Sequence, residues 1–481
     1  MGPENRYAMY EDQSVDTSSI PMSDTPVARP PTPGILVAYR PTLSTISQDR
    51  FSMQRFPFVF GRNRTFCDAI FADNTVSGKH FWIVFEDGAY HLEDAGSRNG
   101  TYLNGTQIFK RQPLKTGDVI RIGQSVLVFH EDVTPMLAIP EKPDRIPGRF
   151  HVHALLDRVE RVVTSGDHIL ITGPSGAGKE LIARIIRQIA ARENPSVPFI
   201  VHNAADFNSE SEAISTLYGV GSHAFTGVGH RKGLIEMASG GILFLDEAHL
   251  YPLHVQSSLN RGMETGEFRR SGDSNIYTSR FRLILATNKP PPDFGVTKDL
   301  RGRTQLVTVP SLEERRADIP DIFNHLLSQK LKDERLPIEP VFQCLDTGHY
   351  ETLCIGDYGA ENVRALRKPA FLLVADIKRG TSINTAVQKA FEEQFGEKFV
   401  ALRIKQRPSE TVRTLTAPTV SIREEHTTNS KYEQNRALIE SLYRQLRGNV
   451  KAVERALLSQ YNVKVTYRWL NEYIKNIWKL V

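Results

Sequence analysis

The sequence predicts three domains in series: an all-β sandwich, a parallel α/β domain with a helical lid, and an all-α block of short helices. Short alternating strands broken by Asp-Gly and Asn-Gly turns fill residues 35–130, which is the pattern of a β-sandwich. From residue 151 the pattern changes to strands alternating with helices, which indicates a parallel α/β domain. From position 431 onward the chain has helical patterning and carries ten Lys/Arg against four Glu.

These changes of pattern divide the chain. Residues near the start are rich in Pro, Ser and Thr, and a second polar stretch precedes the last helices; such compositions favour disorder or linkers. The expected segments are a disordered tail at 1–33, the sandwich at 34–133, a linker at 134–150, the α/β core at 151–310, the helical lid at 311–395, a linker at 396–430 and the terminal helices at 431–481.

Composition excludes several classes of protein. The 481 residues, of which 40% are apolar and 24% charged, suit about three globular domains at roughly 150 residues each. No apolar run approaches the roughly 18–20 residues of a membrane span, and the first residues lack the apolar core of a signal peptide. The three cysteines form no CxxC pair, so we expect neither a disulfide framework nor a cysteine zinc site. A cytoplasmic protein without membrane contact is the expectation.

The loops of the sandwich carry polar residues that suit a phosphate. Arg62 follows a Gly, Ser77 opens a Ser-Gly-Lys-His run, and Asn99 lies in Ser-Arg-Asn-Gly-Thr. An Arg fork with Ser and Asn donors can together hold a phosphate group.

This set of motifs resembles the forkhead-associated (FHA) domain, which binds phosphothreonine peptides. The resemblance covers about residues 36–131. It implies that Arg62 and Ser77 contact the phosphate, that Asn99 contacts the peptide backbone, and that His80 braces the loops. Gly78 replaces an Arg common in the family. The alternative is a scaffold that has lost phosphopeptide binding.

A phosphate-binding loop opens the α/β domain. The buried strand His-Ile-Leu-Ile-Thr at 168–172 precedes it and a helical pattern follows, as a P-loop requires. Its backbone N–H groups and Lys179 are expected to hold the phosphates of ATP. The predicted nucleotide-binding residues are Gly173, Pro174, Ser175, Gly176, Ala177, Gly178, Lys179 and Glu180.

Two further strand ends complete a hydrolytic site. Asp246 and Glu247 follow Gly-Ile-Leu-Phe-Leu; Asp246 suits Mg²⁺ and Glu247 suits polarising the attacking water. Asn288 ends a third strand and can sense the γ-phosphate. ATP hydrolysis is the favoured interpretation.

The motifs from GPSGAGKE through LFLDE to ATN resemble the AAA+ domain of bacterial sigma-54-dependent activators over residues 150–370. The resemblance implies an ATP-hydrolysing ring, usually a hexamer, that remodels sigma-54 RNA polymerase. It also implies catalytic roles for Arg303, acting in trans, and for the lid arginine Arg364. The sigma-54 contact loop would contain Phe225, Thr226 and Gly227.

Several positions depart from that family's pattern. The contact loop has His223 and Val228 at its ends instead of Gly and Ala, His202 replaces an Asn, and Thr297 replaces an Arg. Glu361 stands where the family has Gly in the lid motif. These changes leave open whether the loop engages sigma-54 or another partner, and whether Phe225 instead packs against its own domain.

The terminal helices suit DNA. A Gly-Asn start opens a helix at 448, and a break at 459–463 precedes a second basic segment; this arrangement is typical of a helix-turn-helix. It resembles the Fis-type domain that ends sigma-54 activators, with a turn about two residues longer. Lys464, Arg468 and Lys475 are the predicted DNA contacts. The alternative is a helical dimerisation module.

Taken together, we predict a transcriptional activator of sigma-54 RNA polymerase that binds upstream promoter DNA, hydrolyses ATP with Mg²⁺ as a homo-oligomeric ring, and recognises a phosphothreonine-containing protein. Two alternatives remain at this point. One is a phosphopeptide-binding adaptor whose ATPase-like domain only assembles. The other is an ATPase that acts on another form of polymerase.

Overall fold

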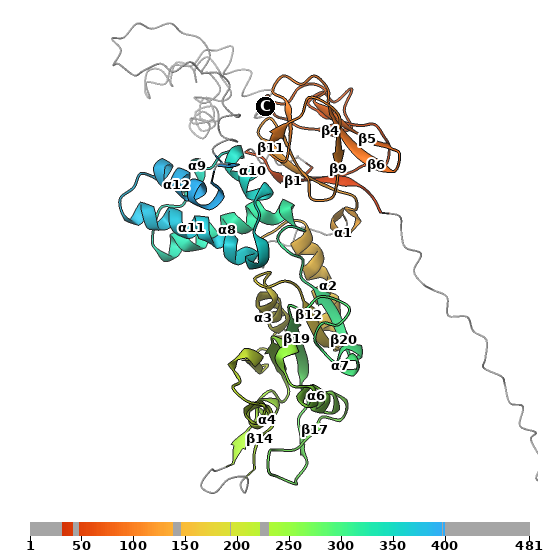
Figure 1. The fold of residues 1–481 in the computed structure, drawn as a ribbon, viewed down its shortest axis with the longest axis vertical. Coiled ribbons are helices and arrows are strands. Elements are labelled where there is room, and N and C mark those ends of the chain that lie inside the picture. Colours follow the sequence, from red (N-terminus) through yellow and green to blue (C-terminus); the bar gives the residue numbers. More distant parts are fainter. Residues whose placement is uncertain are drawn as a thin grey trace, which may run out of the picture. The chain divides into compact units, whose positions relative to one another are not determined.

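The computed structural model describes residues 31–41, 48–137, 146–192, 194–221, 230–396 and 398–399 (Figure 1). The predicted sigma-54 contact loop with Phe225, Thr226 and Gly227 lies outside the described residues. The predicted DNA contacts Lys464, Arg468 and Lys475 also lie outside them. Within the described part of the chain, no helix has the length and apolar character needed to cross a membrane.

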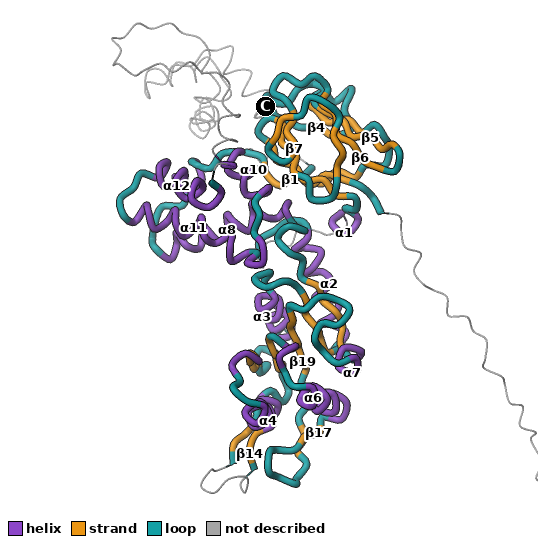
Figure 2. Tube along the Cα trace, in the orientation of Figure 1, coloured by secondary structure: helices purple, strands orange, loops and turns teal. Residues whose placement is uncertain are grey.

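The described residues between 34 and 130 form two β-sheets that pack face to face, as predicted (Figure 2). One sheet has the order β2-β1-β11-β10-β7-β8 and the other β4-β3-β5-β6-β9. Between them lies a core in which the rings of Phe60 and Phe81 stack at 4.4 Å. The strands are β1 Gly34–Tyr39, β2 Arg50–Ser52, β3 Phe58–Gly61, β4 Ala69–Ile70, β5 Phe81–Glu86, β6 Ala89–Asp94, β7 Thr101–Leu103, β8 Thr106–Gln107, β9 Gln112–Leu114, β10 Val119–Ile122 and β11 Ser125–His130.

The α/β domain has five parallel strands in the order β13-β16-β19-β12-β20. Alternate residues of each strand face opposite sides of a sheet, so Ile169 and Ile171 of β12 pack under α2 and α3, whereas Leu170 packs toward α4 to α7. The elements are α2 His151–Ser165, β12 His168–Thr172, α3 Lys179–Ala190, β13 Phe199–Asn203, η1 Ala204–Asp206, α4 Glu210–Tyr218, α5 Leu234–Met237, β16 Ile242–Asp246, η2 Ala248–Leu250, α6 Leu253–Thr265, β19 Arg282–Thr287, α7 Lys298–Gly302 and β20 Thr304–Thr308.

Two small antiparallel ribbons extend from this domain. One pairs β14 Gly219–Val220 with β15 Arg231–Lys232, and the other pairs β17 Glu267–Phe268 with β18 Tyr277–Thr278. The predicted contact loop is the connection between β14 and β15. Its two ends are therefore held together by the pairing of Gly219 with Lys232.

The lid is helical, as predicted for residues 311–395. Its helices surround a buried apolar cluster that includes Phe323, Leu366 and Phe391. The elements are η3 Arg316–Asp318, α8 Ile319–Asp333, α9 Glu339–Gln343, α10 Thr347–Ile355, η4 Gly359–Glu361, α11 Val363–Lys378 and α12 Ile383–Phe395. With the sandwich and the α/β core, the lid confirms the predicted fold class over the described residues.

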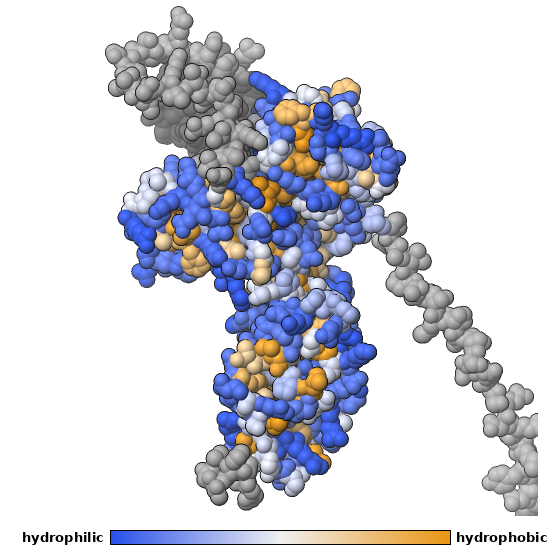
Figure 3. All heavy atoms as spheres, viewed as in Figure 1, coloured by the Kyte–Doolittle hydropathy of each residue, from blue (hydrophilic) through white to orange (hydrophobic). Residues whose placement is uncertain are grey.

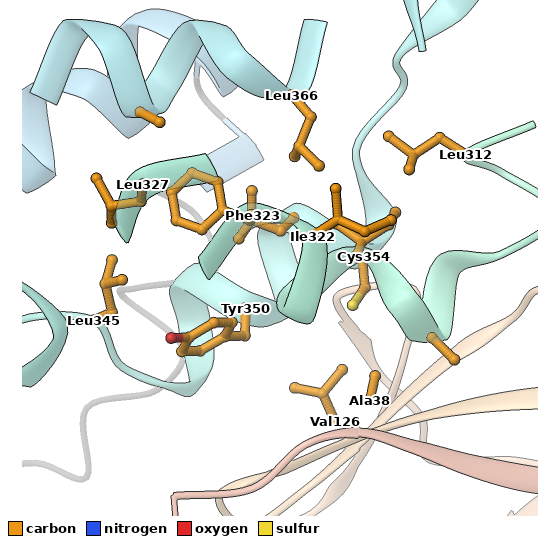
Figure 4. Close-up of a cluster of buried hydrophobic side chains, with 14 of the residues drawn as sticks. Ala38, Val126, Leu312, Ile322, Phe323, Leu327, Leu345, Tyr350, Cys354 and Leu366 are labelled. Atoms are coloured by element: carbon orange, nitrogen blue, oxygen red, sulfur yellow. The ribbon is translucent and has the colours of Figure 1, made fainter. Parts of the chain in front are cut away.

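The sandwich and the lid share one hydrophobic cluster. On β1 and β11, Ile35 and Leu127 face the sandwich core, while Leu36, Ala38 and Val126 face the lid. Figure 4 shows Ala38 and Val126 pointing toward Ile322 and Cys354 of the lid, which are part of that cluster. These strands are buried on both faces, because one face packs in the sandwich core and the other packs against the lid.

Polar contacts reinforce this junction. The Arg121 Nε atom of β10 lies 2.6 Å from Glu351 Oε2 of α10, and the two side chains are 6% and 0% exposed. The Arg121 guanidinium also lies 3.5 Å from the centre of the Tyr102 ring. The rings of Tyr39 and Tyr350 stack at 3.8 Å.

The predicted linker at 134–150 is not a free connection at either described end. A short helix, α1 Thr134–Leu137, follows the sandwich. At the other end, Phe150 is fully buried in the shared cluster. Arg149 donates to the carbonyl oxygen of Ala38 at 2.9 Å and forms an ion pair with Asp321 of the lid at 2.9 Å. The end of this segment therefore fastens the sandwich to the lid.

Exposed apolar residues are scattered on the visible face of the molecule. Figure 3 shows hydrophobic residues in small groups among hydrophilic ones. Among the bulky apolar side chains of the described residues, Phe109 at 83% and Leu253 at 72% have the largest exposed fractions. Isolated exposed apolar residues are normal in folded proteins.

Candidate nucleotide and phosphopeptide sites

The predicted P-loop connects β12 to α3. Gly176 has a φ of +70°, and a Cβ atom there would lie 2.2 Å from the carbonyl oxygen of Glu361. Gly173 has a φ of +153°, and its Cβ would lie 2.5 Å from the carbonyl oxygen of Val309. Only glycine fits these positions. The loop therefore keeps its backbone N–H groups available for a phosphate chain, which suits ATP.

Lys179 is the first residue of α3, and its side chain lies under the loop. It is 8% exposed, and its Nζ donates to the carbonyl oxygens of Gly173 at 2.9 Å and Pro174 at 3.2 Å. Burial lowers the pKa of Lys179, while the charges of Glu247 and Asp246 act in the opposite direction. The Lys179 ammonium therefore lies against the loop that is expected to bind the phosphates.

Asp246 and Glu247 lie at the carboxyl end of β16. Burial raises the pKa of Asp246, and its Oδ1 accepts a hydrogen bond from the Glu247 N–H at 2.9 Å. Glu247 has a left-handed backbone with φ +51°, and its carboxylate lies 3.5 Å from His249 Nδ1. A non-glycine residue in this conformation is uncommon and often belongs to a functional site.

Strand register places the other predicted residues at the same edge. Thr172 of β12 is level with Thr287 of β19, so Gly173 and Asn288 leave the sheet side by side. Asn203 of β13 is level with Asp246. Parallel α/β sheets bind ligands at this edge, beyond the carboxyl ends of their strands.

The lid closes over the P-loop through direct contacts. Arg364 Nη1 donates to Ser175 Oγ at 3.3 Å. Asn362 Nδ2 donates to the carbonyl oxygen of Ser175 at 3.1 Å. Arg315, 4% exposed, donates to the carbonyl oxygen of Ala177 at 2.7 Å. Arg364, which was predicted as a catalytic residue, thus lies at the P-loop, and its catalytic role stays a prediction.

Sequence reasoning assigned no role to Asn362 or Arg315. Asn362 has a φ of +50°, and its Oδ1 accepts from the Leu312 N–H at 2.8 Å. It thus joins the first residues of the lid to the P-loop. The sequence does place Asn362 two residues before Arg364 and Arg315 in a Glu-Arg-Arg run, but neither position shows which loop it contacts.

Two predicted residues lie apart from this group. Glu180 is on the exposed side of α3 and pairs with Arg184 at 2.7 Å. Arg303 forms an ion pair with Glu264 of its own chain, and their side chains are 43% and 44% exposed. The predicted action of Arg303 in trans concerns a neighbouring subunit and stays a prediction.

The residues present fit Mg²⁺ held together with a nucleotide. Among the described residues, no group of three or more His, Cys, Asp or Glu side chains is arranged to hold a metal ion. Mg²⁺ commonly binds through one or two carboxylates and the phosphates of its substrate. The Asp246 carboxylate beside Glu247 and Lys179 is suited to that mode of binding.

The three predicted phosphopeptide residues lie together at one end of the sandwich. The Arg62 N–H donates to the carbonyl oxygen of Ser77 at 2.9 Å, and its Nε donates to the carbonyl oxygen of Val76 at 3.2 Å. Ser77 Oγ accepts from the Arg98 N–H at 3.0 Å. Asn99 Nδ2 donates to the carbonyl oxygen of Thr75 at 2.7 Å. Each of these side chains is oriented by the neighbouring loop.

His80 braces these loops, as predicted. It is fully buried; its Nδ1 accepts from the Ser77 N–H at 3.0 Å, and its Nε2 lies 3.2 Å from the carbonyl oxygen of Gly100. An accepting Nδ1 assigns the proton to Nε2. Burial lowers the pKa of His80, which favours this neutral form.

Comparison with known families identifies both domains. The model described as the sigma-54 interaction domain matches residues 148–305, and the FHA domain model matches residues 58–123. The chain therefore carries an FHA domain followed by a sigma-54 interaction domain of the AAA+ class, as the motifs predicted.

Individual relatives match part of this chain over part of their own length. The Nif-specific regulatory protein of Azospirillum lipoferum is 39% identical over 191 residues, which cover 38% of this chain and 30% of that protein. The Psp operon transcriptional activator of Escherichia coli is 36% identical over 195 residues, which cover 39% of this chain and 59% of that protein. The match thus spans less than two thirds of either relative. The crystal structure of NtrX from Brucella abortus in complex with ATP is 23% identical, covers 67% of each chain and has a TM-score of 0.40.

Proposed function

We propose that this protein is an ATP-hydrolysing transcriptional activator of sigma-54 RNA polymerase, controlled by phosphothreonine recognition through its FHA domain. One observation carries the proposal. Lys179, Asp246 and Glu247 meet at one sheet edge, with Arg364 of the lid on Ser175, inside a domain that matches the sigma-54 interaction model.

In the proposed reaction, water attacks the γ-phosphorus of ATP as the bond to the β–γ bridging oxygen breaks, which gives ADP and phosphate. Glu247 accepts a proton from the water as it attacks. Lys179 stabilises charge on the β- and γ-phosphates, and Asn288 positions the γ-phosphate. Asp246 would hold Mg²⁺, which would neutralise charge on the phosphate oxygens. Arg364, through its contact with the nucleotide, makes the position of the lid depend on whether ATP or ADP is bound.

The proposal includes a homo-oligomeric ring, with a hexamer as the expected form. Arg303 would reach the γ-phosphate held by a neighbouring subunit, where a cation stabilises the charge of the transition state. It must first leave Glu264, with which it pairs within its own chain. Because both side chains are nearly half exposed, this exchange of partners costs little.

The proposed partners are sigma-54 RNA polymerase, upstream promoter DNA and a phosphothreonine protein. The loop with Phe225, Thr226 and Gly227 would contact sigma-54, and Lys464, Arg468 and Lys475 would contact DNA. Support for sigma-54 is the matching domain model, and support for the phosphoprotein is the FHA match together with the grouping of Arg62, Ser77 and Asn99.

Turnover measured as a function of protein concentration tests the ATPase part. We expect ATP turnover per subunit to rise with protein concentration, because in a ring each nucleotide site is completed by a residue of the neighbouring subunit. Lys179→Ala is expected to abolish turnover. If the wild-type protein shows no turnover at any concentration, the adaptor interpretation replaces the ATPase.

Open-complex formation on a sigma-54 promoter tests the partner. Phe225→Ala is expected to retain ATP hydrolysis and to lose open complexes. The wild-type protein could instead hydrolyse ATP but never bind sigma-54, even with a transition-state analogue in its sites. That result would mean that the ATPase acts on another partner.

A further inference from the structure

Four cations surround the proposed phosphothreonine site. Arg62, Arg64, Lys79 and Arg98 lie on the loops that meet at Ser77, and all four side chains are exposed. The loops are joined there by the Arg62, Asn63 and Arg98 N–H groups, which donate to Ser77 O, Gly78 O and Ser77 Oγ. We call these four residues the basic rim.

Within the described residues, no member of the basic rim forms an ion pair with a carboxylate. The Lys79 ammonium instead lies 5.1 Å from the centre of the exposed Phe66 ring, and Arg62 Nε donates to the carbonyl oxygen of Val76. Both cations are therefore held in place while keeping donors for an external anion.

The carboxylates of the same loops have partners other than the basic rim. Asp68 pairs with Arg55 and accepts from the Val59 N–H at 2.9 Å. Asp73 accepts from the Thr75 hydroxyl at 2.6 Å. Asp94 accepts from the hydroxyls of Ser97 and Thr101 at 2.6 Å each. None of the three forms an ion pair with the basic rim, so the rim cations keep donors for the acidic groups of a ligand.

A phosphothreonine alone cannot pair with all four cations of the basic rim. A phosphate carries about −1.5 to −2 near neutral pH, against four positive charges in the rim. We propose that the partner's phosphothreonine lies in an acidic segment, whose Asp or Glu side chains pair with Arg64, Lys79 and Arg98 while the phosphate binds Arg62 and Ser77. This inference rests on the proposed phosphothreonine recognition.

The test uses the full-length protein and three fluorescent peptides: phosphothreonine flanked by Glu, phosphothreonine flanked by Gln, and unphosphorylated Thr flanked by Glu. One exposed ion pair raises affinity by up to about fivefold. Because several such pairs are proposed, the Glu phosphopeptide is expected to bind roughly tenfold more tightly than the Gln phosphopeptide. This preference is expected to shrink as salt is raised.

Charge-removing variants locate the effect. Arg64→Gln, Lys79→Gln and Arg98→Gln combined are expected to abolish the preference for Glu while the Gln phosphopeptide still binds. Lys115→Gln is the control, because Lys115 is an exposed cation of the sandwich that does not belong to the basic rim. Equal affinity for the Glu and Gln phosphopeptides overturns the inference and leaves the proposed function standing. Failure of either phosphopeptide to bind better than the unphosphorylated one overturns both.

A different observation concerns how this site is connected to the lid. Asn99 donates to the carbonyl oxygen of Thr75, and the Thr75 N–H and hydroxyl both donate to Asp73. The other oxygen of Asp73 accepts from the Gln124 N–H at 3.1 Å. The carbonyl oxygen of Gln124 accepts from the hydroxyl of Thr347, the first residue of α10, at 3.0 Å.

The chain of contacts continues to the nucleotide site. The carbonyl oxygens of Cys354 and Gly356, at the end of α10, accept from Arg316 at 2.5 and 3.2 Å. The preceding residue, Arg315, donates to Ala177 of the P-loop. We infer, again on the basis of the proposed function, that phosphopeptide binding is transmitted to the ATPase through Gln124 and Thr347. A contiguous path alone does not demonstrate coupling, so the inference needs a functional measurement.

Thr347→Val removes the hydroxyl and keeps the shape of the side chain. We expect it to retain basal ATP turnover and phosphopeptide affinity, and to reduce the change in turnover caused by phosphopeptide at least twofold. Thr352→Val is the matched control, because the Thr352 hydroxyl is buried in the same helix and, among the described residues, donates only to Gly348 of that helix, at 2.7 Å. Should Thr347→Val fail to fold, Asp73→Asn tests the same path from the sandwich side. A Thr347→Val response equal to wild type, or a wild-type turnover that ignores bound phosphopeptide, overturns this inference.

Discussion

Neutralising Glu351 is expected to loosen the junction between sandwich and lid. The carboxylate and the Arg121 guanidinium are both almost fully buried, and the Nε–Oε2 distance is 2.6 Å. Glu351→Gln keeps the shape of the side chain but leaves the Arg121 charge without its counter-ion. Removal of one partner of a buried pair costs about 3–5 kcal/mol. Because the Tyr102 ring still faces Arg121 at 3.5 Å, we expect the lower end, about 3 kcal/mol.

Hydrogen–deuterium exchange of the full-length protein measures this effect locally. A loss of about 3 kcal/mol corresponds to roughly 100-fold faster exchange in β10 and α10. The double variant Arg121→Met with Glu351→Leu is expected to exchange like wild type within about tenfold, because an apolar pair needs no desolvation. Asp157→Asn, which breaks an exposed pair with Arg161, serves as the control and should leave both elements unchanged. Acceleration by Glu351→Gln of less than about fivefold would refute the reasoning.

The other predictions concern the site and pH. Glu247→Gln is expected to retain nucleotide binding and to slow phosphate release at least about 100-fold, since it removes the base. Gly176→Ala should abolish nucleotide binding but not phosphopeptide binding, because its Cβ would lie 2.2 Å from Glu361 O. Burial lowers the pKa of His130 to about 3 and that of His151 to about 4. Below pH ~6.5 the two histidines bind more protons in the unfolded chain than in the folded one. The free energy of unfolding is therefore expected to fall from pH 6.5 toward pH 4, by up to about 1.4 kcal/mol for each histidine and each pH unit. Urea unfolding at pH 7 and 5 checks this, and His130→Gln should show the shallower dependence.

The fold class and the nucleotide site could be predicted because their signals are local. A buried strand, a glycine loop and an amphipathic helix follow one another directly in the chain around Lys179. Asp246 and Asn288 end apolar strands, and parallel strands bring such ends to one edge. The FHA loops could be predicted equally well, since Arg62, Ser77 and Asn99 each lie beside a Gly in a connection between strands.

The junction of sandwich and lid could not be predicted in the same way. It depends on two surfaces that are distant in sequence and that match only after each domain has folded. One signal was present: β1 and β11 are apolar on both faces, as in Gly-Ile-Leu-Val-Ala-Tyr, whereas a strand with one solvated face alternates with polar residues. That pattern indicates that a second structural element packs on the outer face of these strands, but it does not show which element. Phe150 was placed in a linker because the prolines before it dominated the local composition.

The shared core has a thermodynamic consequence for control. Leu36, Val126 and Phe150 are buried in the same cluster as Leu366 of α11, the helix that carries Arg364. If nucleotide changes the position of Arg364 and Asn362 on the P-loop, the sandwich is displaced with the lid or the cluster is disrupted. Binding free energies at two coupled sites are reciprocal. A phosphopeptide that raises nucleotide affinity by some factor must itself bind more tightly, by that same factor, when nucleotide is present. Phosphopeptide titrations with and without a non-hydrolysable ATP analogue therefore measure the coupling from the sandwich side, and equal affinities in both would mean that the junction carries no signal.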